Sequence, residues 1–112
     1  MARLIVTALS EDTIAAPGNR DPNYIVVSVT DKDGEPITGL GTSNFQVDPM
    51  IVAPFGALVD ITMVTGGGLA GFYRIDVVPI GTETWKSGVY IFAISVTSMA
   101  DKGQALASVL MD

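Results

Sequence analysis

The chain reads VYIFAISVT from Val89 to Thr97, and this stretch decides the fold. Every second residue from Tyr90 to Val96 is apolar, and the residues between them are apolar up to Ala93. Successive side chains of a strand point to opposite faces of its sheet, so both faces of this strand are largely apolar. Strands that are covered on both faces have this character. The stretch therefore predicts a central strand that lies between two covered surfaces.

Six other segments have the composition of β-strands. The clearest runs from Tyr24 to Thr30, where β-branched residues dominate and Ile25, Val27 and Val29 share one side. Glycine, proline, aspartate or asparagine bounds each segment, and these residues favour turns. The other five segments are Arg3–Leu9, Asn44–Asp48, Leu58–Val64, Phe72–Val78 and Gln104–Leu110.

The connections show turn chemistry and not helix signals. Nowhere do apolar residues recur at a spacing of three and four across three helical turns. Residues 11–23, which include Pro17, Gly18 and Pro22, are expected to form a surface loop. Seven short strands separated by turns in 112 residues predict an all-β fold, a single antiparallel β-sandwich domain that spans residues 1–112.

Composition excludes several classes of protein. With 48% hydrophobic and 16% charged residues, the chain is too apolar to be disordered. Six basic and twelve acidic residues give a net charge of -6, which repels phosphate backbones and argues against nucleic acid as a partner. The sequence has no cysteine and no histidine, so it cannot form a disulfide, a thiolate nucleophile, a sulfur-based zinc site or a Ser-His-Asp triad. We therefore expect no enzymatic activity and no cofactor, although carboxylate pairs, Ser-Lys arrangements and hard-metal sites stay open.

Targeting signals are also weak. The apolar stretch from Leu4 to Leu9 is too short for the hydrophobic region of a signal peptide. The charge-free stretch from Ser87 to Ala100 falls short of the roughly 20 residues that a membrane-spanning helix needs. The sequence thus predicts no signal peptide and no membrane span. It leaves the localisation open, with a virion or an extracellular assembly as candidates.

One part of the sequence resembles a known family. The chain reads VTDKDGEPITGL from Val29 to Leu40, with Phe45 and Val47 after it. This succession of a strand, an acidic glycine turn, a proline and a Gly-Leu step resembles the opening of bacterial immunoglobulin-like and macroglobulin-like sandwich domains. The stretches Gly71–Ile75 and Gly88–Val96 are similar to that family's fifth and sixth strands. The resemblance implies an immunoglobulin-like β-sandwich of about seven strands.

The resemblance also implies a role for Tyr90. It sits where these domains carry a tyrosine corner, with the ring buried and the hydroxyl bonded to nearby backbone. The cysteine pair of antibody domains is absent, and Trp85 lies before the sixth strand and not on the third. About function the resemblance implies little, because such sandwiches serve as spacers, adhesins, subunits of assemblies and enzyme appendages.

Two features suggest ligand sites, and each has a structural alternative. Asp31, Asp33 and Glu35 lie in an acidic turn that could hold calcium, but the turn lacks the downstream bidentate glutamate of an EF-hand, which favours a solvated turn. The glycines 66–68 lack the Lys and Ser or Thr that a phosphate loop needs, which favours a simple connection.

Aromatic and acidic residues raise two further possibilities. Trp85, Tyr24 and Tyr73 could form an exposed platform for carbohydrate, although a lone tryptophan near a strand end more often packs over the edge of the sandwich. Asp60 and Asp76, in the middle of predicted strands, are expected to face solvent or to meet Arg74 across a sheet.

The scarcity of charge is the most informative feature. A solitary sandwich normally carries lysine and glutamate on its outer faces, but this chain has six basic residues in all. Several predicted outward positions are apolar, Val64 and Val78 among them, and so is the segment Met50–Phe55, which is expected to be a loop. We expect protein subunits to cover the surface formed by Val26, Met50, Ile51, Val52, Phe55, Leu58, Phe72, Val89 and Ile91.

Two classes of function follow from these patterns. The favoured one is a non-catalytic structural or interaction module, a homo-oligomer or a subunit of a virion, phage-like particle, filament or surface fibre, held by sheet-face packing or by strand addition. The alternative is a carbohydrate-binding or calcium-dependent module of a larger protein.

Overall fold

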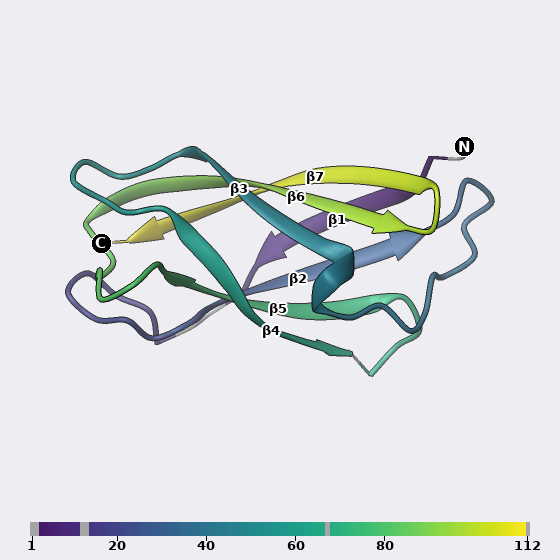
Figure 1. Ribbon diagram of the computed structural model, residues 1–112, viewed down its shortest axis with the longest axis horizontal. Coiled ribbons are helices and arrows are strands. Elements are labelled where there is room, and N and C mark those ends of the chain that lie inside the picture. Colours follow the sequence, from purple (N-terminus) through teal and green to yellow (C-terminus); the bar gives the residue numbers. More distant parts are fainter. Residues whose placement is uncertain (1–2, 12–13, 67, 112) are drawn as a thin grey trace.

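The computed structural model describes residues 3–11, 14–66 and 68–111. These residues form seven strands and one short 3-10 helix (Figure 1). Residues 12, 13 and 67, which fall in two of the expected connections, lie outside the described residues. In chain order the elements are β1 (Ile5–Ser10), β2 (Asn23–Thr30), η1 (Thr42–Asn44), β3 (Phe45–Ile51), β4 (Val59–Gly66), β5 (Phe72–Pro79), β6 (Gly88–Ser98) and β7 (Asp101–Met111).

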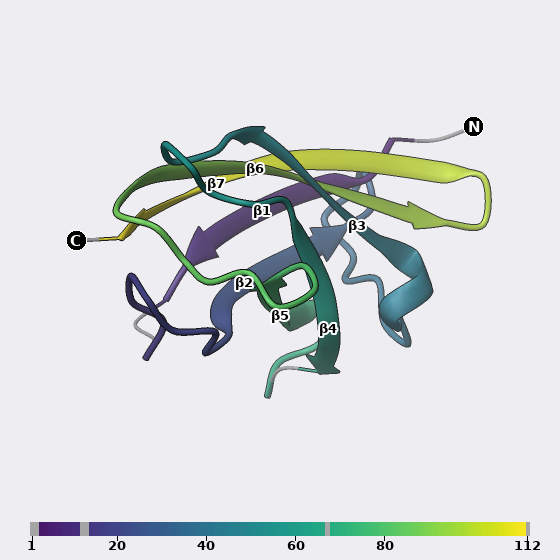
Figure 2. The same cartoon turned by 60° about the vertical axis from the view of Figure 1, so that its left-hand side comes forward.

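The strands form two antiparallel sheets that pack face to face. One sheet has the order β1-β2-β5-β4 and the other the order β3-β6-β7. Figure 2 shows the second sheet lying over the first, with β1 beside β7. This order is the one found in constant-type immunoglobulin domains. The predicted antiparallel seven-stranded β-sandwich is therefore confirmed.

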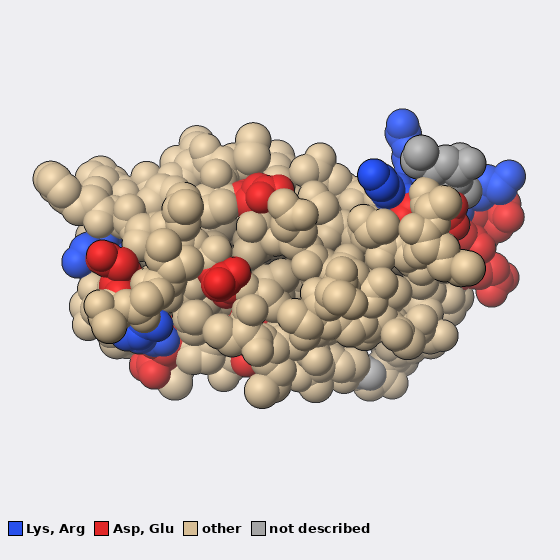
Figure 3. Space-filling model, viewed as in Figure 1, with Lys and Arg blue, Asp and Glu red and all other residues tan. Residues whose placement is uncertain are grey.

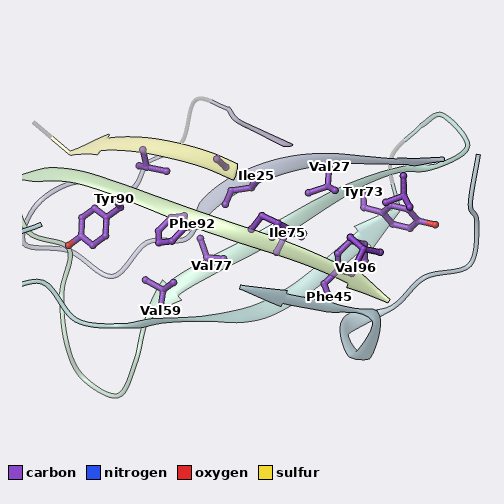
Figure 4. Packing of buried hydrophobic residues seen from close by; sticks show 14 of the residues in the cluster. Ile25, Val27, Phe45, Val59, Tyr73, Ile75, Val77, Tyr90, Phe92 and Val96 are labelled. Atoms are coloured by element: carbon purple, nitrogen blue, oxygen red, sulfur yellow. The ribbon is translucent and has the colours of Figure 1, made fainter. Parts of the chain in front are cut away.

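The interior is filled by alternate residues of the strands in both sheets. Ile25 and Val27 of β2 and Ile75 and Val77 of β5 face Phe92 and Val96 of β6 (Figure 4). Full burial of an aliphatic or aromatic side chain of this size contributes about 1.5–3 kcal/mol. The same alternation that predicts the strands thus supplies the core that holds the sheets together.

Tyr90 forms the expected tyrosine corner at the start of β6. Its ring is buried and lies 5.0 Å from that of Trp85 in an edge-to-face arrangement. Its hydroxyl accepts a hydrogen bond from the backbone N–H of Lys86 at 3.0 Å. The corner fixes the β5–β6 connection against the end of the core.

β6 is the central strand of its sheet, as predicted, but one of its two faces is not covered. Tyr90, Phe92, Ile94 and Val96 point into the core and are buried. Val89, on the outer side, is exposed, and no third layer of described residues lies over this face. The prediction of two covered faces is therefore wrong for the chain by itself.

Two predicted positions along the edge strands need correction. β3 continues to Ile51, so Met50 and Ile51 belong to a strand and not to a loop. In β4 the register shifts between Ile61 and Met63, which is a β-bulge. The extra residue reverses the alternation, so Val64 packs against the core although it was expected to face outward.

Candidate interaction surface

The outer face of the β3-β6-β7 sheet carries a group of apolar side chains. Strand pairing places Val89 opposite Leu110, Ala93 opposite Leu106, and Ile51 opposite Ile91. Leu106 is 63% exposed and Leu110 is 65% exposed, whereas Ile91 is half-buried between its neighbours. We call this group the β6 face and define it as Met50, Ile51, Val89, Ile91, Leu106 and Leu110.

The loop after β3 brings a further aromatic residue to the same end of the sheet. Phe55 is 94% exposed and has a φ of 64°, a left-handed conformation that is costly for a bulky side chain. A turn closed by the N–H of Gly56 and the carbonyl of Ala53, at 2.8 Å, holds this conformation. A Cβ atom on Gly88 would lie 2.8 Å from the Cβ of Ala53, so this loop packs directly on the start of β6.

Two other predicted residues lie in the same loop, where Val52 packs against the core and the carbonyl of Leu58 accepts from the N–H of Ile80, next to β5. Leu58 is exposed, Val52 is half-buried, and both lie in the connection between β3 and β4. Seven of the nine predicted interface residues therefore lie on the β6 face or in the loop that adjoins it.

Charged side chains are rare on this sheet. The outward positions of β3, β6 and β7 contain two ionisable residues, Asp48 and Lys102, and Lys102 lies at the far end of the sheet. Figure 3, which views the sandwich from the side of the edge strands β3 and β4, shows lysine and arginine gathered at the two ends of the long axis, with only carboxylates between them. The β6 face itself carries no charged side chain, although a solitary sandwich would be expected to carry charge on such a surface.

Val26 and Phe72 lie apart from the other predicted interface residues. Both belong to the outer face of the β1-β2-β5-β4 sheet, where Val26 is half-buried opposite Leu9. With Thr7 and Ser28 they line a shallow groove of about 180 Å³. The predicted surface is therefore divided between two faces of the molecule.

The middle of this second face is polar. Arg74 Nε lies 3.1 Å from Asp76 Oδ1, and the guanidinium carbon lies 4.2 Å from the centre of the Tyr24 ring. Asp76 is buried and meets Arg74 on its own strand, so the expectation of a solvent-facing or cross-sheet carboxylate is wrong; Asp60 is exposed, as expected. Because this ion pair would have to be desolvated, the second face is less suited than the β6 face to an apolar contact with a partner.

Leu106 and Leu110 belong to the β6 face but were not predicted. The sequence places small residues, Ala105 and Ala107, at the alternate positions of β7. Alternation sets Leu106 and Leu110 on one side of β7 with Gln104 and Ser108, and sets Ala105 and Ala107 on the other side with Val109 and Met111. The second set faces the core, where Ala107, Val109 and Met111 are buried, so this alternation is the signal that could have identified the two leucines as outward.

The predicted aromatic platform does not form. Trp85 has no exposed surface, and its indole N–H donates to the carbonyl of Asp21 at 2.8 Å. Tyr73 is also buried, with its hydroxyl donating to the carbonyl of Ile37 at 2.7 Å. Tyr24 lies half-buried under Arg74, on the outer face of the β1-β2-β5-β4 sheet. These rings serve the packing of loops and strands, so they offer no exposed stacking surface for carbohydrate.

The acidic turn has a structural role. Asp31 Oδ1 accepts the N–H groups of Asp33 and Glu35, at 2.9 and 3.0 Å. This arrangement is an Asx-type turn, in which the aspartate side chain stabilises its own loop. Among the residues that the structure describes, no three acidic side chains come together as a metal site would require.

Searches for related proteins gave no further guidance. No family model, no curated protein and no solved structure matches the chain. Within the described residues, no helix is long and apolar enough to cross a membrane.

Proposed function

We propose that the protein is a non-catalytic structural module that assembles with further copies of itself through the β6 face, as a subunit of a particle, filament or fibre. The observation that supports this most strongly is the row of exposed apolar side chains on a three-stranded sheet with a single carboxylate near its middle. Burial of each exposed leucine would contribute about 1.5–3 kcal/mol. The strand order and the Tyr90 corner support placing the domain among the immunoglobulin-like and macroglobulin-like sandwiches.

The charge distribution supports a second copy as the partner. Each chain carries a net charge of -6, so contacts between most parts of two copies bring like charges together. The β6 face is the exception, because it contains no ionisable residue, and the outward side of the same sheet adds only Asp48 and the distant Lys102. Two copies that meet there bury apolar surface while their charged ends stay in water.

Leu106→Lys tests the proposal, with Leu9→Lys as the matched control. Both leucines lie in edge strands and are well exposed, at 63% and 71%, but they belong to opposite sheets. Native mass spectrometry and light scattering of the wild type should show oligomers. An unpaired lysine buried in an apolar contact costs more than about 1.4 kcal/mol, so Leu106→Lys should weaken association by at least about tenfold.

The two variants also make the proposal refutable. Leu9→Lys should leave the oligomer intact, and both variants should melt near the wild-type temperature because the changed side chains are exposed. A wild type that stays monomeric into the high micromolar range would overturn the proposal. So would an oligomer that Leu9→Lys disrupts and Leu106→Lys does not.

A further inference from the structure

A surface cavity of about 470 Å³ lies at the end of the β6–β7 hairpin, away from the β6 face. Its lining residues are Arg3, Leu4, Ser95, Val96, Thr97, Lys102, Gly103 and Gln104. Small-molecule sites have volumes of roughly 300–1,000 Å³, so the cavity is large enough for a ligand.

The backbone brings two cations together at this cavity. Arg3 forms a parallel bridge with Lys102, and the N–H of Leu4 donates to the carbonyl of Lys102 at 2.8 Å. Leu4 is buried in the core, so the preceding Arg3 faces the other way, toward the outer side of the sheet. Lys102 is also exposed on that side, which places the two basic side chains next to each other.

Gly103 makes this close approach possible. A Cβ atom at position 103 would lie 2.6 Å from the carbonyl oxygen of Leu4 and 2.7 Å from Cγ2 of Val6. Any larger residue would push the first strand away from β7. Arg3 is therefore positioned by backbone packing and not only by its flexible side chain.

Neutral hydrogen-bonding groups complete the lining. Cross-strand pairing sets Ser95 opposite Gln104 and Thr97 opposite Lys102, and Gln104 Nε2 donates to Ser95 Oγ at 3.4 Å. Two hydroxyls and one amide can therefore donate beside the two cations.

The charge of this lining is unusual for the chain. None of the lining residues is acidic, although the sequence has twelve acidic and six basic residues. Among the described residues one ion pair forms, between Arg74 and Asp76, so Arg3 and Lys102 take part in none there. Like charges on adjacent strands repel each other, and a bound anion would remove that repulsion.

We propose that this cavity binds a tetrahedral oxyanion, sulfate or phosphate, as a free ion or as a group on a small molecule. Arginine offers a planar fork of N–H donors and lysine a compact charge, a combination that suits an anion with several oxygens. Ser95, Thr97 and Gln104 would donate to the remaining oxygens.

The test is a titration of the full chain, followed by amide NMR and melting temperature. The probes are sodium sulfate, sodium phosphate and glucose 6-phosphate, with sodium acetate and sodium chloride at matched ionic strength as references. Binding should give saturable shifts in segments 95–97 and 102–104. A ligand at tenfold its Kd should raise the Tm by about 5 °C. Tighter binding of glucose 6-phosphate than of phosphate would assign the site to a group on a larger ligand, and equal binding would assign it to the free ion.

Lys102→Gln and Lys32→Gln separate a site from a general salt effect. Both remove one positive charge, but Lys32 lies in the β2–β3 connection and does not line the cavity. Lys102→Gln should weaken the affinity of the saturable binding at least about tenfold, whereas Lys32→Gln should leave that affinity unchanged. Equal losses in the two variants, no saturable shift, or an equal response to acetate or chloride would overturn the proposal.

Discussion

Tyr90 is the residue at which the core and the loops of one end of the sandwich meet. Its ring contacts Trp85 at 5.0 Å and Phe92 at 6.0 Å between ring centres. Trp85 in turn is tied to the β1–β2 loop, because its backbone N–H donates to Asn19 and its carbonyl accepts from Gly18. The Tyr90 hydroxyl is thus one of several contacts that hold the β5–β6 connection, which in turn holds the β1–β2 loop.

Tyr90→Phe should lower the free energy of unfolding by about 1–2 kcal/mol, because the Lys86 N–H loses its acceptor while the ring packing stays. Denaturant unfolding should show a lower midpoint with an unchanged m-value. Tyr24→Phe is the matched control, since the Tyr24 ring packs under Arg74 on an outer face and its change should stay within about 0.5 kcal/mol. Equal effects of the two changes would mean that the corner hydrogen bond contributes nothing.

Single residues also show where sequence reasoning succeeds and where it stops. The role of Tyr90 is implied by the resemblance to immunoglobulin-like domains, and the hydroxyl does bond to backbone four residues upstream. Packing of Trp85 at the edge of the sandwich is the favoured expectation, but its partner could not be predicted, because the Asp21 carbonyl is 64 residues away in a loop whose path no local pattern specifies. A buried indole N–H usually donates to a hydrogen-bond partner of this kind.

At the scale of elements, alternation predicts the strands but not the irregularities that orient them. All seven expected strands are present, and β6 is central, since local apolar patterns reflect the shared core. The bulge in β4 turns Val64 inward, although strict alternation would point it outward. The bulge is an extra residue in the pairing with β5, which the composition of β4 does not specify, so the facing of Val64 could not be predicted, whereas the alternation of β7 does point Leu106 and Leu110 outward.

Gly103→Ala is expected to separate β1 from β7. The new methyl group would lie within 3 Å of three atoms of Leu4 and Val6, so the free energy of unfolding should fall by about 1–3 kcal/mol. Hydrogen exchange of the Leu4 amide should accelerate, because its bond to the Lys102 carbonyl is lost.

Gly41→Ala serves as the control for this change. Gly41 has a φ of -125°, which any residue can adopt, and a methyl group there meets nothing within 4 Å. The free energy of unfolding of the Gly41→Ala variant should stay the same or rise by up to about 1 kcal/mol. If Gly103→Ala behaved in the same way, the contact between β1 and β7 would be looser than the structure indicates.

At the scale of the whole molecule, charge and apolar surface are segregated. Five of the six basic residues lie in or beside the connections at the two ends, and Arg74 is the one in the middle of a strand, on the second sheet. Acidic residues outnumber basic ones two to one, so each copy repels another at long range. The β6 face carries no charge, so two copies that meet there attract each other at short range through apolar contact.

This balance predicts how salt affects assembly. Raising sodium chloride from about 10 mM to 150 mM shortens the Debye length from about 30 Å to 8 Å, which screens the repulsion between copies of charge -6. The contact between apolar faces does not depend on that screening, so the dissociation constant of the oligomer should fall as salt rises. Sedimentation velocity across this range measures the change. Dissociation at higher salt would show instead that ion pairs between the charged ends hold the copies together, and Leu106→Lys would then leave assembly unaffected.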